Sequence, residues 1–182
     1  MFGARKAICQ PWVGVLPLLL AACSTSSPTA RYRDPAMAAV KLDADDQALV
    51  VLATASGVTM TELEQRRLRE SVQSAIVARK VHNDGDGRVQ RYRLELTIVR
   101  YEKGNAAARA VFPGGVSQIH IDSTAALVQL GDPERHVSEF DLNKTFAWGG
   151  PVGAVTPMTE VEYGFAAGCA EAIAGGPLPR RR

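Results

Sequence analysis

The chain has 182 residues, of which 46% are apolar and 22% are charged, and its 21 lysines and arginines nearly balance its 19 aspartates and glutamates. This is the composition of an ordinary globular protein, and it excludes collagen-like, coiled-coil and wholly disordered chains. The balanced charge also argues against a nucleic-acid-binding protein, in which basic residues exceed acidic ones on at least one face. We expect one compact domain that binds no nucleic acid.

The first 22 residues have the organisation of a secretory signal peptide. Arg5 and Lys6 precede an uncharged, mostly apolar stretch from Trp12 to Ala22, which is the usual order of a positive and an apolar region. As a helix, the 11 residues of this stretch would span about 16 Å, whereas the hydrocarbon core of a membrane is about 30 Å thick. The stretch is therefore too short for a transmembrane anchor, and residues 1–22 are expected to direct export.

The end of this segment, Leu20-Ala21-Ala22-Cys23, resembles the bacterial lipobox, in which the cysteine is acylated and the chain is cut before it. Two or three acyl chains anchor a protein durably, whereas one anchors it only marginally. Ser24 follows the cysteine, at a position where lipoproteins retained in the inner membrane often carry aspartate. The resemblance implies a palmitate-bearing lipoprotein that is joined to the outer membrane at Cys23 and faces the periplasm.

The cysteines are consistent with an exported lipoprotein. Cys9 is lost with the signal peptide and Cys23 takes the lipid, so only Cys169 remains in the mature chain. A single thiol allows no intrachain disulfide in an oxidising compartment. The mature domain must therefore be stabilised by apolar burial.

Two segments of biased composition flank the expected domain. Residues 23–35 are rich in Ser, Thr and Pro and poor in aliphatic side chains, which is typical of a flexible tether. Residues 177–182 have the composition of a disordered basic tail that runs to Arg180, Arg181 and Arg182. This tail is either solvated or in contact with anionic lipid headgroups. The folded domain is expected at residues 36–176.

Within this domain the period of the apolar residues changes along the chain. A continuous apolar run at residues 48–53 predicts a strand that is covered on both faces. Overlapping capping boxes at Thr59 and Thr61 precede an apolar stripe of helical period, which predicts a helix over residues 61–80.

The second half of the domain predicts three strands and a helix. Residues 92–98 alternate apolar and polar side chains, which indicates a strand with one buried face. Residues 116–130 and 137–147 predict two further strands of an antiparallel meander. A capping box of Thr159 and Glu162 predicts the start of a last helix, which ends at Gly175-Gly176. The expected fold is a single small α+β domain of order β-α-β-β-β-α, with two helices packed on a mostly antiparallel sheet.

No residues have the spacing of a metal or cofactor site. Asn83-Asp84-Gly85-Asp86-Gly87 resembles part of a calcium-binding loop, but the matching register puts His82 and Arg93 at positions that need oxygen ligands. We expect a turn there instead. The three histidines, His82, His120 and His136, do not lie at ligand spacings. We therefore expect no metal and no cofactor.

Three stretches of the chain resemble the signature of an uncharacterised bacterial lipoprotein family, classed as a domain of unknown function. They are Tyr101-Glu102-Lys103-Gly104-Asn105-Ala106-Ala107-Ala108-Arg109, Pro113-Gly114-Gly115, and Lys144-Thr145-Phe146-Ala147-Trp148-Gly149-Gly150. The likeness covers roughly residues 45–175 and the lipobox. It implies a secreted, lipid-anchored α+β domain and supplies no catalytic residues.

These stretches also contain the residues that could bind a ligand. Arg109 is a lone charge in an alanine-rich stretch, so it is either ion-paired with Glu102 or Asp122 or faces a carboxylate or phosphate ligand. The glycine-rich segments around it supply turns in which the backbone can approach a ligand closely. The candidate ligand-binding residues are Gly104, Asn105, Arg109, Gly149 and Gly150.

We expect a lipid-anchored, non-enzymatic lipoprotein of the cell envelope that binds a protein or an envelope polymer through the exposed end of its sheet. The alternative is a subunit of an envelope transport or assembly complex. A third hypothesis is an enzyme, because His120 and Asp122 share a strand face and Arg109 could join them. It is the weakest of the three, since the sequence contains no motif for an activated nucleophile.

Overall fold

The computed structural model describes residues 28–80, 89–111, 117–147 and 155–175. These residues form one α+β domain, in which helices pack on a five-stranded sheet of order β1-β5-β4-β3-β2. The fold class expected from the sequence is confirmed. In chain order the elements are β1 (Thr29–Tyr32), a 3-10 helix η1 (Pro35–Ala39), β2 (Gln47–Thr54), α1 (Glu62–Arg79), β3 (Arg91–Glu102), α2 (Ala106–Val111), β4 (Ile119–Gln129), β5 (Arg135–Phe146) and α4 (Met158–Ala174).

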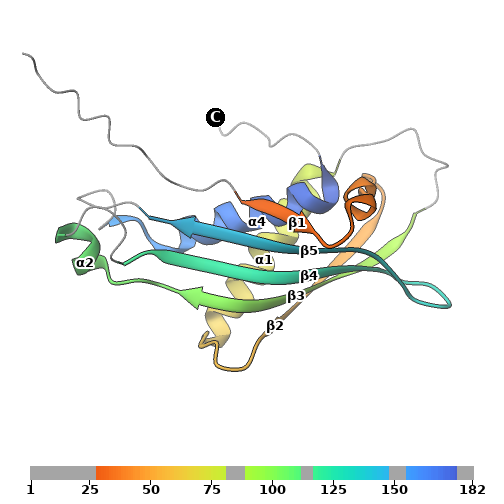
Figure 1. The fold of residues 1–182 in the computed structure, drawn as a ribbon. Coiled ribbons are helices and arrows are strands. Elements are labelled where there is room, and N and C mark those ends of the chain that lie inside the picture. The colour runs from red at the N-terminus through yellow and green to blue at the C-terminus, as the bar shows by residue number, and fades with distance from the viewer. Residues whose placement is uncertain (1–27, 81–88, 112–116, 148–154, 176–182) are drawn as a thin grey trace, which may run out of the picture.

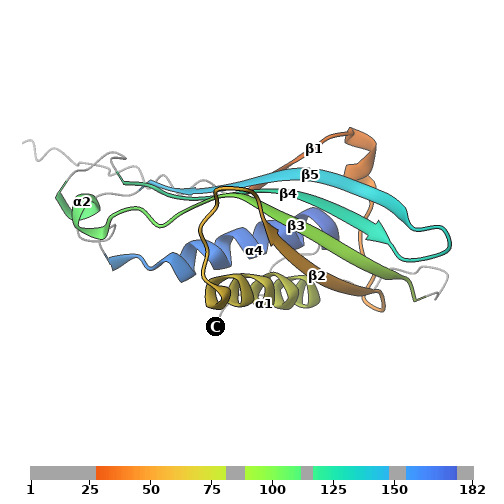
Figure 2. The same cartoon turned by 90° about the horizontal axis from the view of Figure 1, so that it is seen from below.

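The sheet is built on the antiparallel meander that the sequence predicts. β3 pairs with β4 and β4 pairs with β5, both antiparallel. β2 joins the outer side of β3 in parallel, and β1 joins the outer side of β5 antiparallel. Figures 1 and 2 show α1 and α4 side by side on one face of this sheet, while α2 lies beyond the end of β3.

The hydrophobic core lies between the sheet and these two helices. The alternating strand residues and the helical stripes both turn their apolar side chains inward, as their periods predict. Leu68, Val72 and Ile76 of α1 are fully buried, and so are Phe165 and Cys169 of α4. Burial raises the pKa of the Cys169 thiol, so this cysteine is a packing residue and not a reactive thiol.

The environment of β2 differs from the sequence expectation. The apolar run at 48–53 predicted a strand with both faces covered, but Leu49 is 60% exposed and Val51 is 43% exposed. β2 is the last strand of the sheet, and α1 covers only the face that carries Val50. An apolar run alone does not distinguish an edge strand from a central one.

The N-terminal segment also differs from the expectation. Residues 29–32 were expected to belong to the tether, but they form β1. Tyr32 packs on Phe140 with 5.6 Å between ring centroids, and its hydroxyl donates to the carbonyl of Ala172 at 2.8 Å. These contacts come from residues that are more than a hundred positions away in the sequence, so local composition could not reveal them.

The helix boundaries follow one predicted cap and depart from another. Thr61 and Glu64 form the predicted capping box of α1, while the overlapping box at Thr59 is not used. α4 begins one residue before Thr159, with Pro157 as its N-cap and no side-chain cap, so the predicted capping box of that helix is wrong. Its predicted end is confirmed, because Gly175 adopts a φ of 64°, which favours glycine.

Several sequence predictions lie outside the described residues. They concern the signal peptide, Cys23, the Asp84/Asp86 turn, His82, Gly149 and Gly150. Within the described ranges, none of the helices is both long enough and apolar enough to cross a membrane.

Candidate functional site

The first candidate residues, Gly104 and Asn105, have local structural roles after the end of β3. Gly104 adopts a φ of 61°, a conformation that suits glycine. The Asn105 side chain accepts hydrogen bonds from the backbone N–H groups of Ala107 at 2.9 Å and Ala108 at 3.2 Å. It thus satisfies two donors in the first turn of α2. These two residues shape the entry into α2.

Arg109 lies within α2, but its side chain is outside the described part of the structure. The two carboxylates expected as its partners are both close to another arginine. Arg100 donates to Glu102 at 2.7 Å and lies 4.0 Å from Asp122. Whether Arg109 pairs with either carboxylate or faces a ligand stays a prediction.

His120 and Asp122 both lie on the sheet face opposite the two helices, as their spacing on one strand predicts. The His120 ring contacts Thr145 Oγ1 at 3.1 Å, and Asp122 accepts a hydrogen bond from the Asn143 amide. Their neighbours on three adjacent strands form a continuous line of polar side chains. We call this line the outer row, and it consists of Arg100, Glu102, His120, Asp122, Asn143 and Thr145.

The outer row has hydrogen-bonding groups but no arrangement typical of a catalytic site. His120 contacts a threonine, and its strand neighbour Asp122 contacts an amide and a guanidinium. Catalysis by a nucleophile requires a hydroxyl or thiol beside a base that a third group orients. The Thr145 hydroxyl lies 3.1 Å from the His120 ring, while Asp122 contacts Asn143 and Arg100. No cluster of three or more potential metal ligands (His, Cys, Asp or Glu) occurs in the described part of the chain. The outer row thus supplies hydrogen-bond donors and acceptors on one face of the sheet.

A second polar cluster, which the sequence did not reveal, lies on the helix side of the sheet. Glu162 of α4 is 1% exposed. It accepts hydrogen bonds from Arg67 Nε at 2.6 Å and Arg67 Nη2 at 2.8 Å, and from the Tyr101 hydroxyl at 2.5 Å. We call Arg67, Tyr101 and Glu162 the buried triad. It joins α1, α4 and β3 at a single carboxylate.

The electrostatics of the buried triad favour a charged arginine and a neutral tyrosine. The hydrogen bond to Glu162 is the main cause that raises the pKa of Arg67. Burial, followed by the hydrogen bond to Glu162, raises the pKa of Tyr101. Tyr101 therefore remains a hydrogen-bond donor throughout the physiological range and does not act as a base.

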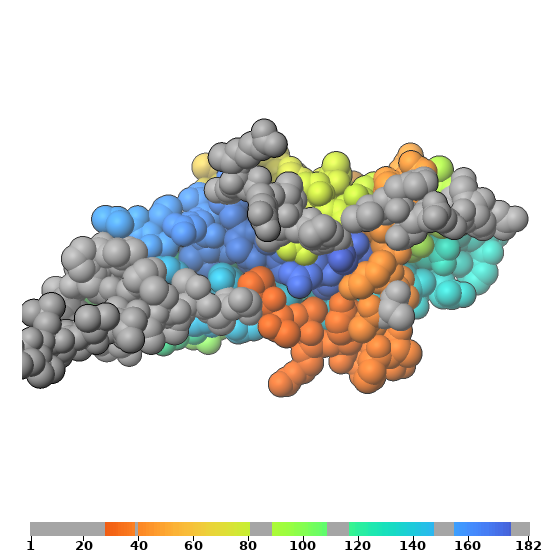
Figure 3. All heavy atoms as spheres, turned by 90° about the horizontal axis from the view of Figure 1, so that it is seen from above, coloured from red at the N-terminus to blue at the C-terminus, as the bar shows by residue number. Residues whose placement is uncertain are grey.

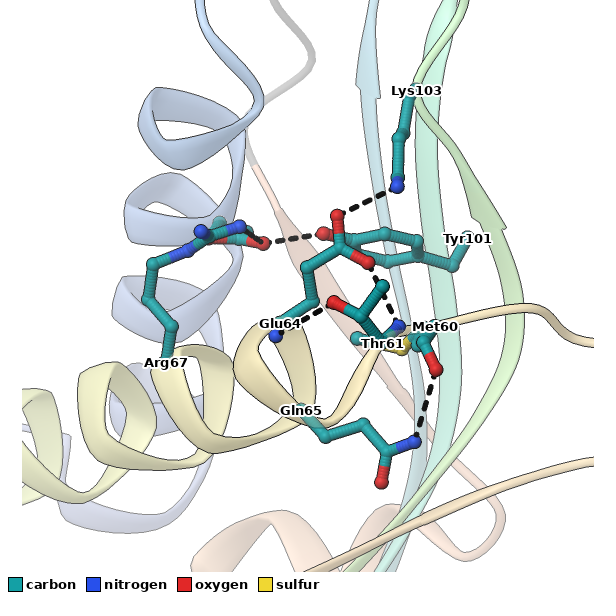
Figure 4. A network of polar contacts seen from close by, with 8 residues as sticks. Met60, Thr61, Glu64, Gln65, Arg67, Tyr101 and Lys103 are labelled. Carbon is teal, nitrogen blue, oxygen red and sulfur yellow. Dashed lines mark hydrogen bonds and ion pairs between the residues drawn. The ribbon is translucent and has the colours of Figure 1, made fainter.

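The N-terminus of α1 continues this cluster towards the solvent, as Figure 4 shows. Lys103 Nζ lies 2.7 Å from Glu64 Oε1. The Glu64 carboxylate also accepts a hydrogen bond from the backbone N–H of Thr61 at 2.9 Å. Burial alone would raise the pKa of Glu64, but the hydrogen bonds from Lys103 and Thr61 outweigh it and hold the pKa below its usual value. The capping box is thereby linked to β3.

A groove of about 710 Å³ runs between β1 and α4. Its floor includes two glycines of α4, Gly164 and Gly168. A Cβ atom on Gly168 would lie only 2.6 Å from Cγ of Pro28 and closer still to its Cβ, so the missing side chain makes the notch that Pro28 occupies. The charged residues of the groove are Lys41, Arg79 and Glu171.

The comparisons with known proteins establish similarity of fold alone. No protein-family model matches the chain, and no curated protein sequence matches it. Among solved structures, the chain is similar to the PelC dodecamer from Paraburkholderia phytofirmans, with 14% identity, a TM-score of 0.50, and coverage of 80% of this chain and 98% of that chain. A point variant of the same PelC dodecamer, solved in another crystal form, gives 14% identity, a TM-score of 0.51, and coverage of 81% and 98%.

Proposed function

We propose that this protein is a lipid-anchored, non-enzymatic lipoprotein of the cell envelope that works as a subunit of a homo-oligomeric assembly. The observation that carries this proposal is the similarity of fold to PelC, which extends over 98% of that chain, together with the crystallisation of PelC as a dodecamer. Among the hypotheses from the sequence, the PelC dodecamer favours the subunit of an assembly, and the place of that assembly in the envelope rests on the lipobox. The lipobox at Cys23 supplies the anchor.

A binding role is supported by the way in which the domain uses its charged groups. The buried triad joins secondary-structure elements, and its carboxylate is engaged by two partners. The outer row, by contrast, presents charged and amide groups on the open face of the sheet. Partly exposed donors and acceptors on a rigid sheet suit recognition of a protein or an envelope polymer.

The proposal is tested on the full chain, expressed in a bacterium and extracted from the membrane fraction in mild detergent. Light scattering should give a protein mass that is a multiple of the processed chain, which is lighter than the 19.5 kDa of all 182 residues because residues 1–22 are removed. Labelled palmitate should be incorporated, and Cys23→Ser should abolish the incorporation. A monomer across the accessible concentration range would contradict the assembly. Label that survives the substitution would contradict the lipid anchor.

A further inference from the structure

The position at which the chain becomes fixed to the domain is much closer to Cys23 than the sequence suggested. Pro28 sits in the notch of Gly168, where an added Cβ would be 2.6 Å from Pro28 Cγ and closer still to its Cβ. β1 follows at once and pairs with β5 from Thr29 onward. The Tyr32 hydroxyl then ties β1 to the carbonyl of Ala172. From Pro28 onward the chain is therefore part of the domain.

The remaining linker limits how the domain can sit on a membrane. Pro28 lies five positions after Cys23, and a fully extended chain of that length reaches at most about 18 Å. β1 and β2 are the two edges of the five-stranded sheet, and four strand spacings amount to about 19 Å. A lipid on Cys23 therefore holds the β1 edge near the bilayer, because the linker cannot reach around the domain to the β2 edge.

The C-terminal end of the domain lies on the same side. Figure 3 shows β1 and η1 beside the C-terminal half of α4 and the last turns of α1. Lys41 packs against the end of α4, where its Nζ donates to the carbonyls of Ala172 at 2.5 Å and Glu171 at 3.2 Å. The three arginines at 180–182 begin five residues after Gly175, so they can reach the surface that a lipid on Cys23 would contact.

The β1 and β2 edges of the sheet also differ in charge. In the groove beside β1, Arg79 is 5% exposed and pairs with Glu171 at 3.4 Å, so the basic group left at the surface of this groove is that of Lys41, which is exposed. In the groove beside β2, Asp46 is 5% exposed and accepts from the backbone N–H groups of Asp43 and Gln90. The charges of Asp45 and Lys80 then balance each other there. Anionic lipid headgroups attract basic groups that lie within a Debye length of the surface. Lys41, together with the three arginines that follow the domain at 180–182, therefore gives the β1 edge the excess of basic groups that suits an anionic lipid surface.

We propose that the β1 edge is the membrane-facing surface of this protein and contacts anionic lipid headgroups. This surface, here called the anchor face, consists of β1, η1, Lys41 and residues 164–174 of α4. The proposal rests on the lipid anchor proposed above and adds an orientation to it. Because Pro28 packs on Gly168, the short linker holds the anchor face against the bilayer and leaves the outer row and the β2 edge accessible to partners.

The test places one fluorophore on each edge of the full-length, lipidated chain in vesicles. Ala38→Cys puts a thiol in the groove beside β1, and the matched control Leu49→Cys puts one on the exposed side of β2. The native Cys169 is fully buried, so a thiol reagent should not label it, and the unsubstituted chain measures any background. The vesicles contain phosphatidylethanolamine, phosphatidylglycerol and a lipid with a nitroxide on its headgroup, which quenches nearby fluorophores.

The label at position 38 should be quenched several-fold more strongly than the label at position 49. Replacing phosphatidylglycerol with phosphatidylcholine should weaken the quenching at position 38 and leave that at position 49 unchanged. Equal quenching at the two positions, or stronger quenching at position 49, would overturn the proposed orientation. The proposal would also be overturned if the label at position 38 were unquenched in vesicles and its emission showed, already in detergent, that it is shielded from water. That result would show that this face is an interface between copies of the chain.

The failure of the lipid anchor is distinguishable from the failure of the orientation. A chain that does not float with the vesicles has no functional anchor, and this result would overturn both proposals. A chain that floats but shows no difference between the two labels retains its anchor and contradicts only the anchor face. Thermal melts of the two cysteine variants confirm that each remains folded before labelling.

Discussion

On the helix side of the sheet the Glu162 carboxylate is 1% exposed and has two partners, whereas on the open side Arg100 and Glu102 are 45% and 51% exposed. Both sides thus contain ion pairs at short distances. Burial makes the difference, because a buried charge that loses its partner cannot recover hydration, and a surface pair exchanges its partner for water at little cost. The buried triad therefore contributes to the fold, whereas the charges of Arg100 and Glu102 in the outer row remain accessible to solvent.

Of the substitutions that test this difference between the two sides of the sheet, Arg67→Ala should lower the stability most. The substitution removes the charged partner of the buried Glu162 carboxylate. The cost should be about 3 kcal/mol of unfolding free energy, at the low end of the range for buried pairs, because Arg67 itself is 34% exposed and water can take its place. The matched control is Arg66→Ala, because Arg66 is the preceding residue on α1 and is exposed. Its effect should stay within about 0.5 kcal/mol. Denaturant melts of both variants measure the difference, and equal effects would contradict a structural role for the triad.

The two sides also differ in how far the sequence predicts them. The stripe of Leu68, Val72 and Ile76 and the capping box of Thr61 are local patterns, and they correctly predicted α1. Glu162 was assigned to a capping box because its spacing from Thr159 fits one. Its actual partners come from α1 and β3, so only the tertiary structure reveals them. A carboxylate directly after Val161 and three residues before Phe165, on the apolar stripe of α4, was the available signal.

The edges of the sheet were less predictable than its centre. Alternation over residues 92–98 identified β3 because a half-buried strand has that period. β1 has only four residues, and it is stabilised by contacts with Phe140 and Ala172. The position of β2 at the edge depends on strand order, which an apolar run does not encode. For the outer row, the shared face of His120 and Asp122 was predictable, and their partners Thr145 and Asn143 were not.

The second-largest effect on stability is expected in α4, where Gly168 and Gly164 form a matched pair for substitution. Gly168→Ala places a methyl group 2.6 Å from Pro28 Cγ and closer still to its Cβ, and such overpacking should cost about 1–3 kcal/mol. Gly164→Ala places one 2.9 Å from Lys144 Cε, which belongs to a flexible side chain that can shift. The gain in helix propensity should then make this variant neutral or slightly more stable. Thermal melts that rank the two variants in the opposite order would contradict the notch.

Tyr101→Phe should have a smaller effect, because it removes one hydrogen bond to Glu162 and leaves the arginine in place. Hydrogen bonds to charged groups contribute about 1.5–3 kcal/mol, and the loss should lie at the low end of that range since Arg67 still compensates the carboxylate. A double-mutant cycle with Arg67→Ala measures how strongly the two donors depend on each other. Additive effects would show that they do not share the carboxylate.

The stability of the protein should depend on pH through Glu64, at the edge of the helix side. The pKa of Glu64 is held below its usual value of 4.5 by Lys103 and Thr61. A group with a lowered folded-state pKa contributes stability above its unfolded pKa, and this contribution disappears as the pH falls through the folded value. Lys103→Ala should therefore lower stability slightly at neutral pH, and this effect should shrink as the pH falls below the ordinary value of 4.5 and disappear below the lowered folded-state pKa of Glu64. Melts across this range, compared with the parent chain, provide the measurement, and a difference that persists in acid would assign another role to Lys103.

The smallest expected effect on stability belongs to the outer row. Arg100→Ala removes the ion pair with Glu102 and the longer approach to Asp122, and exposed pairs contribute at most about 1 kcal/mol. The free energy of unfolding should therefore change by less than this amount, because water replaces the guanidinium at both carboxylates.

If the open face of the sheet recognises a partner, Arg100→Ala should also reduce capture of that partner by in-cell crosslinking. The control Arg66→Ala, which removes an exposed arginine from α1, should leave capture unchanged. A destabilised Arg100→Ala variant would place the outer row with the buried triad as a structural element. A stable variant with unchanged capture would move recognition away from this face and towards the β2 edge, where Leu49 and Val51 are exposed.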